Sequence, residues 1–204
     1  QHATFQFILD KVSRQFIWSF LHSHPFYNSE QVSQRYVHVA SENFTVPPMD
    51  EKAYELYLAT IQLQMDAYEK LIVILEPTVR REYAKLFPNR DPELKRWKSA
   101  LQKRGQEVAR YILPVATHAH LYHTVSGLTL HRYHKLSEQF DTPYEQKIVI
   151  GKMIEAVNEV DPLFFRNIED TIPLSETPEY EFFAARSLSQ DVASREEFLD
   201  EFDT

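Results

Sequence analysis

The sequence predicts an α+β protein in which a few strands pack against several long helices. Residues 2–9 are rich in aromatic and β-branched side chains, which is typical of a strand. Residues 50–75 carry apolar side chains at three- and four-residue steps, which is typical of an amphipathic helix. A hydrophobic content of 43% in 204 residues provides enough apolar material for the core of one domain.

The first fifty residues are expected to combine short strands with one helix. Residues 11–22 repeat apolar side chains every four positions, with Ser13 as a helix cap, and Pro25 disfavours helical geometry at the residue before it. An irregular hinge should follow. Residues 35–40 predict a short strand, and residues 43–48 an extended segment that stops at two prolines.

Helices are expected to dominate the rest of the chain. The helix over residues 50–75 should break at Pro77, and a short helix should cover residues 78–86. Val108 should face the interior on the next helix, with Arg110 pointing away from the buried side. The remaining expected elements are a helix from Asp91 to residue 112, a strand at 117–125, helices at 128–139 and 143–160, and short helices near 179–187 and 194–202.

The net charge of −8 is unevenly distributed. Residues 169–204 hold 11 acidic and 2 basic side chains, whereas the rest of the chain is close to neutral. We therefore expect a folded domain over residues 1–168 and an acidic C-terminal extension over residues 169–204. Nucleic acid is not an expected partner, because no broad basic face is predicted.

Composition also excludes several classes of site. With 3 glycines there is no Gly-rich phosphate loop, and without cysteine there is neither a disulfide nor a thiolate metal site. No run of the sequence is apolar and long enough for a membrane span, and no signal peptide is recognised, so we expect a cytoplasmic protein without a membrane partner.

A polar group at residues 33–36 is the first candidate site. Ser33 and Arg35 are spaced so that a hydroxyl and a forked guanidinium could hold one anion from two sides. Arg110 could add a second guanidinium. The alternative is that these arginines form ordinary surface pairs with Glu30 or Glu107.

Several segments together resemble the flavin-dependent thymidylate synthases, also known as thymidylate synthase complementing proteins. The core motif of that family reads Arg-His-Arg, two residues, Ser, one residue, Asn-Glu-Gln-Ser, one residue, Arg-Tyr. Here His24 matches the central histidine, and Ser33, Arg35 and Tyr36 match the end of the motif. A second resemblance lies downstream. In this family a helix ends in a similar way and is followed by a Leu-Pro pair, as in the run Glu-Val-Ala-Arg that ends at Arg110 and the Ile-Leu-Pro that ends at Pro114.

The resemblance covers residues 1 to about 160, and it implies a fold, an activity and a set of site residues. The implied fold is a small antiparallel sheet packed against several long helices, with an N-terminal portion of the family missing. The implied activity converts dUMP to dTMP with FAD, NADPH and methylenetetrahydrofolate in a homotetramer. The catalytic side chains are left unknown. The implied substrate-binding residues are Gln31, Ser33, Gln34, Arg35 and Arg110, and the implied cofactor-binding residues are His24, Ser126 and Arg132.

The chain departs from the family pattern mainly where a flavin would bind. Ser23 and Pro25 replace the two motif arginines, and Ser126 and Leu128 replace an Asn and an Arg of a later motif. One alternative is therefore a catalytically inactive relative that serves as a nucleotide-binding or scaffold protein.

A second alternative is a metal enzyme built on a histidine cluster. His118, His120 and His123 fall on one predicted strand, and His131 and His134 lie one turn apart on the next helix. Neutral imidazole suits zinc or iron. Strand alternation, however, places His123 on the opposite face from the other two. Ordinary packing is the favoured interpretation, and no metal is predicted.

Overall fold

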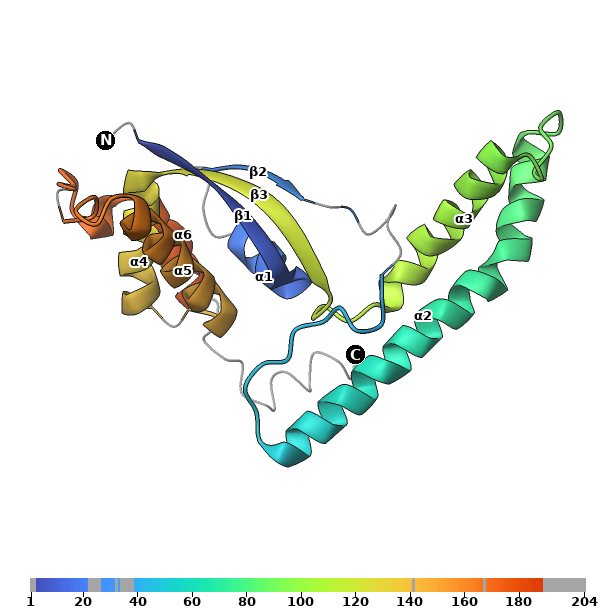
Figure 1. Cartoon of the computed structure of the whole chain (residues 1–204), viewed down its shortest axis with the longest axis horizontal. Helices are drawn as coiled ribbons and strands as arrows, with labels where there is room; N and C mark the ends of the chain where they lie inside the picture. Colours follow the sequence, from blue (N-terminus) through green and yellow to red (C-terminus); the bar gives the residue numbers. More distant parts are fainter. Residues whose placement is uncertain are drawn as a thin grey trace. The chain divides into compact units, whose positions relative to one another are not determined.

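The fold is described from a computed structural model, which describes residues 3–21, 27–31, 33, 39–140, 142–166 and 168–188 (Figure 1). The chain forms two compact units. Unit 1 consists of Gln1–Leu9, Phe16–Glu30 and Tyr122–Thr204, and unit 2 consists of Asp10–Gln15 and Gln31–Leu121. Strands and helices together give the predicted α+β class, with a small sheet and several helices.

The sheet has three strands in the order β1-β3-β2. β1 spans Thr4–Ser13 and β3 spans His118–Ser126. They run antiparallel, because the N–H of Gly127 donates to the carbonyl of Ala3 (2.9 Å) at one end and the N–H of Arg14 to that of Thr117 (3.0 Å) at the other. The strands predicted at 2–9 and 117–125 are thus confirmed, and α1 (Arg14–Leu21) begins later than expected because β1 continues to Ser13.

β2 (Tyr27–Gln31) was not expected, because its sequence YNSEQ is polar and poor in strand-forming residues. It is an edge strand that pairs with β3. The backbone hydrogen bonds of this pairing stabilise the strand in spite of its low strand propensity. Most of the strand predicted at 35–40 lies outside the described residues, and residues 39–40 are not in a strand.

The expected break at Pro77 is wrong, because α2 runs without interruption from Glu51 to Leu86. It begins at Asp50, whose side chain accepts a hydrogen bond from the N–H of Ala53 (2.9 Å). An interior proline costs a helix about 3 kcal/mol. Tertiary packing outweighs this local preference, because α3 lies along this part of α2. Arg80 also bonds to Glu76 one turn earlier and to Glu93 on the following segment.

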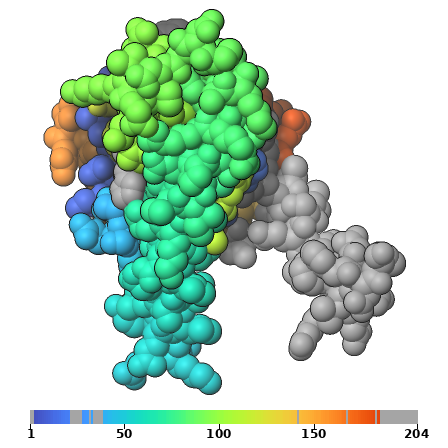
Figure 2. Space-filling model, turned by 90° about the vertical axis from the view of Figure 1, so that its right-hand side faces the viewer, coloured from blue at the N-terminus to red at the C-terminus, as the bar shows by residue number. Residues whose placement is uncertain are grey.

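α3 (Lys95–Ala109) returns along the C-terminal part of α2 and ends in the 3₁₀ turn η1 (Arg110–Ile112). Figures 1 and 2 show α3 covering only that part of α2, with the end near Glu51 projecting beyond it. Tyr83 and Trp97 join the two helices with ring centroids 6.0 Å apart. The helix begins later than the start predicted at Asp91: its N-cap is Leu94, which has no side-chain cap hydrogen bond. The carboxylate of Asp91 instead accepts from the N–H of Glu93 (2.9 Å) in the segment before the helix.

The face expected to be buried on α3 is confirmed at Leu101 and wrong at Val108. Leu101 is buried, whereas Val108 is 51% exposed and the neighbouring Ala109 is buried in its place. Arg110 is consequently half-buried rather than directed away from the packed side. The buried core of unit 2 is formed by Val39, Ile61, Met65, Tyr68 and Ala109.

Unit 1 contains a group of helices that pack on one another (Figure 1). α4 (Gly127–Gln139), α5 (Tyr144–Val160) and α6 (Pro178–Leu188) confirm the predictions at 128–139, 143–160 and 179–187, and the 3₁₀ turn η2 (Leu174–Glu176) precedes α6. The helix predicted at 194–202 lies outside the described residues. None of the helices in the described part of the chain is both long and apolar enough to cross a lipid bilayer.

Residues beyond 168 pack against α4. The ring of Phe183 lies 6.5 Å from that of Tyr133 and 6.2 Å from that of Phe140, and its side chain is 6% exposed. Thr177 and Glu179 are fully buried. The boundary at residue 168 between a domain and an extension stays a prediction.

Gly127 and Gly151 give a matched pair of glycine-to-alanine substitutions with opposite expected effects. A Cβ on Gly127 would lie 2.5 Å from Cζ of Phe164 and 3.1 Å from Cε2 of Phe5, whereas a Cβ on Gly151 would meet nothing within 4 Å. We expect Gly127→Ala to lower the free energy of unfolding by about 1–3 kcal/mol through overpacking. Gly151→Ala should raise it by about 0.5–1 kcal/mol through helix propensity.

Urea unfolding of both variants beside the wild type measures the difference. The double variant Gly127→Ala/Phe164→Leu should recover part of the loss, since the clash is with that ring. Equal stabilities of the two single variants would contradict the packing described for Gly127.

Candidate functional site

Three polar side chains from separate parts of the chain belong to one region of unit 2. Arg14 is the first residue of α1, Gln31 is the last residue of β2, and Arg110 opens η1. The guanidinium of Arg14 donates from Nη1 to Oε1 of Gln31 at 2.6 Å. Arg110 donates from Nε to the carbonyl of Glu107 (3.2 Å), which holds the start of its side chain.

Backbone hydrogen bonds connect these residues. Besides the bond from Arg14 to Thr117, the N–H of Gln15 donates to the carbonyl of Val115 at 2.9 Å. Thr117 closes a turn by donating from both its N–H (3.0 Å) and its hydroxyl (2.6 Å) to the carbonyl of Pro114. The N–H of Leu113 donates to the carbonyl of Arg110 at 3.1 Å. The turn between η1 and β3 thus attaches the start of α1 to the residues that follow Arg110.

The electrostatics of this region favour an anion. The pKa of Arg14 is lowered, first by burial and then by the positive charge of Arg110. Among the described residues no carboxylate pairs with either arginine, and the carboxylate of Glu107 is engaged by Arg104. Two cations that repel each other without a neutralising acid can together bind a small anion.

The sequence predicted part of this arrangement. Gln31 and Arg110 were both predicted as substrate-binding residues, and the structure places them in unit 2 with Ser33, which is half-buried. His24, Gln34 and Arg35 lie outside the described residues, so their assignments stay predictions. Arg14 was missed. The available signal was a cation in the first turn of a helix, where positive charge is unfavourable and no acidic residue compensates for it.

The predicted cofactor residues Ser126 and Arg132 belong to unit 1. The hydroxyl of Ser126 caps α4 by accepting from the N–H of Thr129 (3.0 Å). Arg132 donates from Nε and Nη2 to the two oxygens of Asp170 (2.7 and 2.9 Å) and from Nη1 to Glu179 (3.0 Å). We call Arg132, Asp170 and Glu179 the arginine clamp.

The arginine clamp is buried and internally satisfied. The exposed fraction of the side chain is 10% for Arg132, 11% for Asp170 and 1% for Glu179. The hydrogen bond from Arg132 lowers the pKa of Asp170 and, reciprocally, raises the pKa of the arginine. Removing one partner of such a buried group typically costs about 3–5 kcal/mol. The clamp therefore anchors the segment beyond residue 168 to α4.

The described residues of the predicted flavin site do not fit a flavin diphosphate in this arrangement. A diphosphate needs donors that are available to it, whereas the guanidinium of Arg132 is held by two carboxylates and the hydroxyl of Ser126 by the first turn of α4. An added phosphate would also meet the second, unneutralised acid of the arginine clamp. No chemical step through a flavin follows from these residues.

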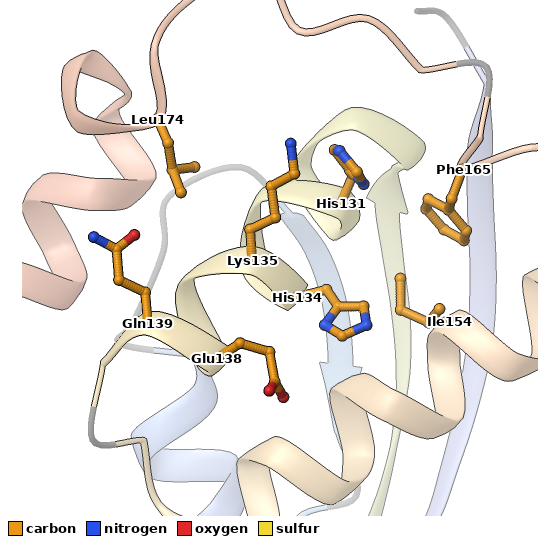
Figure 3. A pocket seen from close by; sticks show the side chains of 8 residues that line it. All are labelled: His131, His134, Lys135, Glu138, Gln139, Ile154, Phe165 and Leu174. Carbon is orange, nitrogen blue, oxygen red and sulfur yellow. The ribbon is translucent and has the colours of Figure 1, made fainter.

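A cavity of about 510 Å³ opens beside α4 in unit 1 (Figure 3). His131 and Lys135 lie on one side of it, and the ring of His131 stacks on Phe165 at 5.9 Å between centroids. Burial, and then the charge of Lys135, lowers the pKa of His131. The cavity is lined by His131, His134, Lys135, Glu138, Gln139, Ile154, Phe165 and Leu174.

The histidines of β3 follow the predicted alternation. His123 is fully buried, whereas His118 and His120 are half-buried. Nδ1 of His123 lies 2.6 Å from the hydroxyl of Ser29, and its ring lies 4.9 Å from that of Phe20. Burial lowers the pKa of His123 to about 4, so the ring is neutral near pH 7. In the described part of the chain no group of three or more histidines and acids could hold a metal ion.

The sequence model of one family, described as thymidylate synthase complementing protein, matches residues 1–163. The chain belongs to this family, which confirms the resemblance found in its motifs. A comparison with curated proteins found no match.

Solved structures with a similar fold include two of PolB, a UMP/dUMP methylase from Streptomyces cacaoi. The structure with 5-Br dUMP has a TM-score of 0.57 and 15% identity, and the match covers 81% of this chain and 71% of that one. The structure with 5-Br UMP has a TM-score of 0.52 and 14% identity, covering 80% and 71%. At these identities the likeness concerns the fold.

His123 should make stability depend on pH. Because its pKa is about 4 in the folded chain and 6.5 in the unfolded chain, the unfolded state takes up a proton first as the pH falls. The contribution of the neutral ring is intact above pH 6.5 and is lost progressively toward pH 4. At pH 5 the loss should be about 2 kcal/mol of unfolding free energy.

Urea unfolding at pH 7 and pH 5 measures this loss. His123→Gln cannot titrate and should show a difference between the two pH values that is smaller by that amount. His120→Gln, on the same strand and half-buried, is the control and should behave as the wild type. A His123→Gln protein with an undiminished pH dependence would show that other groups cause it.

Proposed function

We propose that this protein is a thymidylate synthase-like nucleotide methylase whose substrate is a uridine 5′-monophosphate, dUMP or a close relative. The observation that carries the proposal is the grouping of Arg110 and Gln31 with Arg14 in unit 2, where two guanidiniums lack an acidic partner among the described residues. A phosphomonoester carries about 1.5 to 2 negative charges at pH 7, which two arginines can neutralise.

Family membership supports the choice of ligand. The matched family is the thymidylate synthase complementing proteins, and the similar PolB structures hold 5-Br dUMP and 5-Br UMP. From the family we also propose that this protein converts dUMP to dTMP with FAD, NADPH and methylenetetrahydrofolate. We further propose that it is a homotetramer with a cytoplasmic location. Ser33, Gln34 and Arg35 complete the proposed substrate site, and His24 remains proposed for the cofactor.

Replacing Arg110 tests the substrate site. We expect the wild type to bind dUMP, and Arg110→Met to weaken that binding by roughly 10- to 100-fold, the loss expected for a hydrogen-bonded charge. Isothermal titration calorimetry at constant ionic strength gives the dissociation constants. Arg81→Met removes the same charge from an exposed position of α2 and should bind as the wild type does.

The substrate proposal fails if the wild type does not bind dUMP or UMP. It also fails if Arg110→Met and Arg81→Met bind the nucleotide equally well.

A second candidate function is that of a nucleotide-binding relative without a flavin. The observation in its favour is the arginine clamp, which engages Arg132 with two carboxylates, together with Ser23 and Pro25 in place of the motif arginines. Such a protein would bind the nucleotide through the same residues of unit 2 and would lack the methylation reaction.

Flavin uptake separates the two candidate functions. The methylase proposal requires purified protein incubated with FAD to retain it after gel filtration and to show the visible absorbance of a flavin. Protein that stays colourless and still binds dUMP supports the second candidate instead.

The variant Asp170→Asn/Glu179→Gln tests the part played by the arginine clamp. If the clamp is what prevents binding, this variant should take up FAD where the wild type does not. Glu181→Gln removes an exposed acid of α6 and serves as the control.

A further inference from the structure

Arg14 occupies a position that is unfavourable for the free protein. It lies in the first turn of α1, at the positive end of the helix dipole, and no acidic side chain shares that turn. It is half-buried, which adds a desolvation cost to its charge. A cation in such a place, without an acidic partner among the described residues, is suited to a negatively charged ligand.

The position of Arg14 is nevertheless well defined. Its N–H is bonded to Thr117, and Gln15 is bonded to Val115, so the backbone is held on the turn that precedes β3. Its guanidinium is oriented by the 2.6 Å bond to Oε1 of Gln31. That bond uses one N–H of the five on an arginine, which leaves the others for a ligand. The amide nitrogen of Gln31 is a further donor on the same side chain.

The same ligand would meet Arg110. The charge of Arg110 acts directly on Arg14, and among the described residues neither arginine has an acidic partner. The backbone of Arg14 and Gln15 is bonded to the turn that follows η1, so α1 and η1 present the two guanidiniums to the same region of unit 2. Forked donors from two directions suit the tetrahedral oxygens of a phosphate better than a single carboxylate.

We propose that Arg14 is a phosphate-binding residue of this protein, which acts with Arg110 on the dianionic phosphate of a nucleoside 5′-monophosphate while Gln31 orients it. The proposal rests on the proposed function and deepens it. Binding then depends on the phosphate more than on the nucleoside. It also follows that the free protein carries an electrostatic cost that the bound phosphate removes.

Replacing Arg14 separates a binding role from a structural one. Arg14→Met should weaken dUMP binding by roughly 10- to 100-fold while leaving the weak binding of deoxyuridine unchanged. In the absence of ligand, the same variant should unfold at a higher temperature than the wild type, because the repulsion with Arg110 is gone. A residue with only a structural role would lower that temperature. Arg14→Lys keeps the charge without the fork and should bind dUMP with intermediate affinity.

The experiment uses the full chain, calorimetry with dUMP and deoxyuridine, and thermal unfolding with and without inorganic phosphate. Phosphate should stabilise the wild type more than chloride at equal ionic strength, and it should not do so for Arg14→Met. Arg81→Met is the control, because it removes one charge from an exposed site on α2.

The outcomes distinguish this proposal from the proposed function. If Arg14→Met and Arg81→Met bind dUMP equally well, the role of Arg14 is refuted and the substrate proposal stands. The role of Arg14 is also refuted if Arg14→Met is destabilised while Arg14→Lys binds as the wild type does. If the wild type and Arg81→Met both fail to bind dUMP, both proposals fail together.

Discussion

The antiparallel pairing of β1 with β3 is the constraint on which the candidate site depends. Hydrogen bonds at the two ends of the pair, from Gly127 to Ala3 and from Arg14 to Thr117, determine its register. Slipping by one residue would turn every side chain of a strand to the opposite face. The same register brings the start of α1 to the turn that follows Arg110. Two arginines far apart in the sequence thereby come to act on each other, with Gln31 bonded to one of them.

The chain uses arginine in two contrasting electrostatic settings. Arg132 is surrounded by Asp170 and Glu179, so its charge is neutralised inside the protein, where it joins the segment beyond residue 168 to α4. Arg14 and Arg110 have no such acids among the described residues and repel each other. A buried charge that is satisfied internally contributes to structure, whereas an unsatisfied pair retains the capacity to bind an external anion. This difference supports the binding of a nucleotide phosphate by the arginines of unit 2. It does not support the binding of a flavin by Arg132, where the sequence had predicted one.

Part of the candidate site could be named from the sequence, and the failures have physical causes. Gln31 and Arg110 were predicted from the resemblance to a family, the structure places both in unit 2, and their binding role stays a prediction. Arg14 was missed because an isolated arginine after a strand becomes informative only when its neighbours are known. β2 was missed because its pairing partner, and not its own propensity, makes it a strand. The break at Pro77 was wrong because a proline penalty is local, whereas α3 packs along this part of α2 and the helix continues through it.

The sequence by itself determined the α+β class, most helix positions and the family, because helical periodicity, strand composition and motif spacing are local properties of the chain. Only the tertiary structure decided which charges are neutralised and which are not. Neutralisation depends on residues that are far apart in the sequence and close in space. Arg132 bonds to Asp170 and Glu179, whereas the charge of Arg110 acts on Arg14. Coulomb interactions act through space, so no pattern along the chain could reveal that one arginine is an anchor and another a candidate ligand for phosphate.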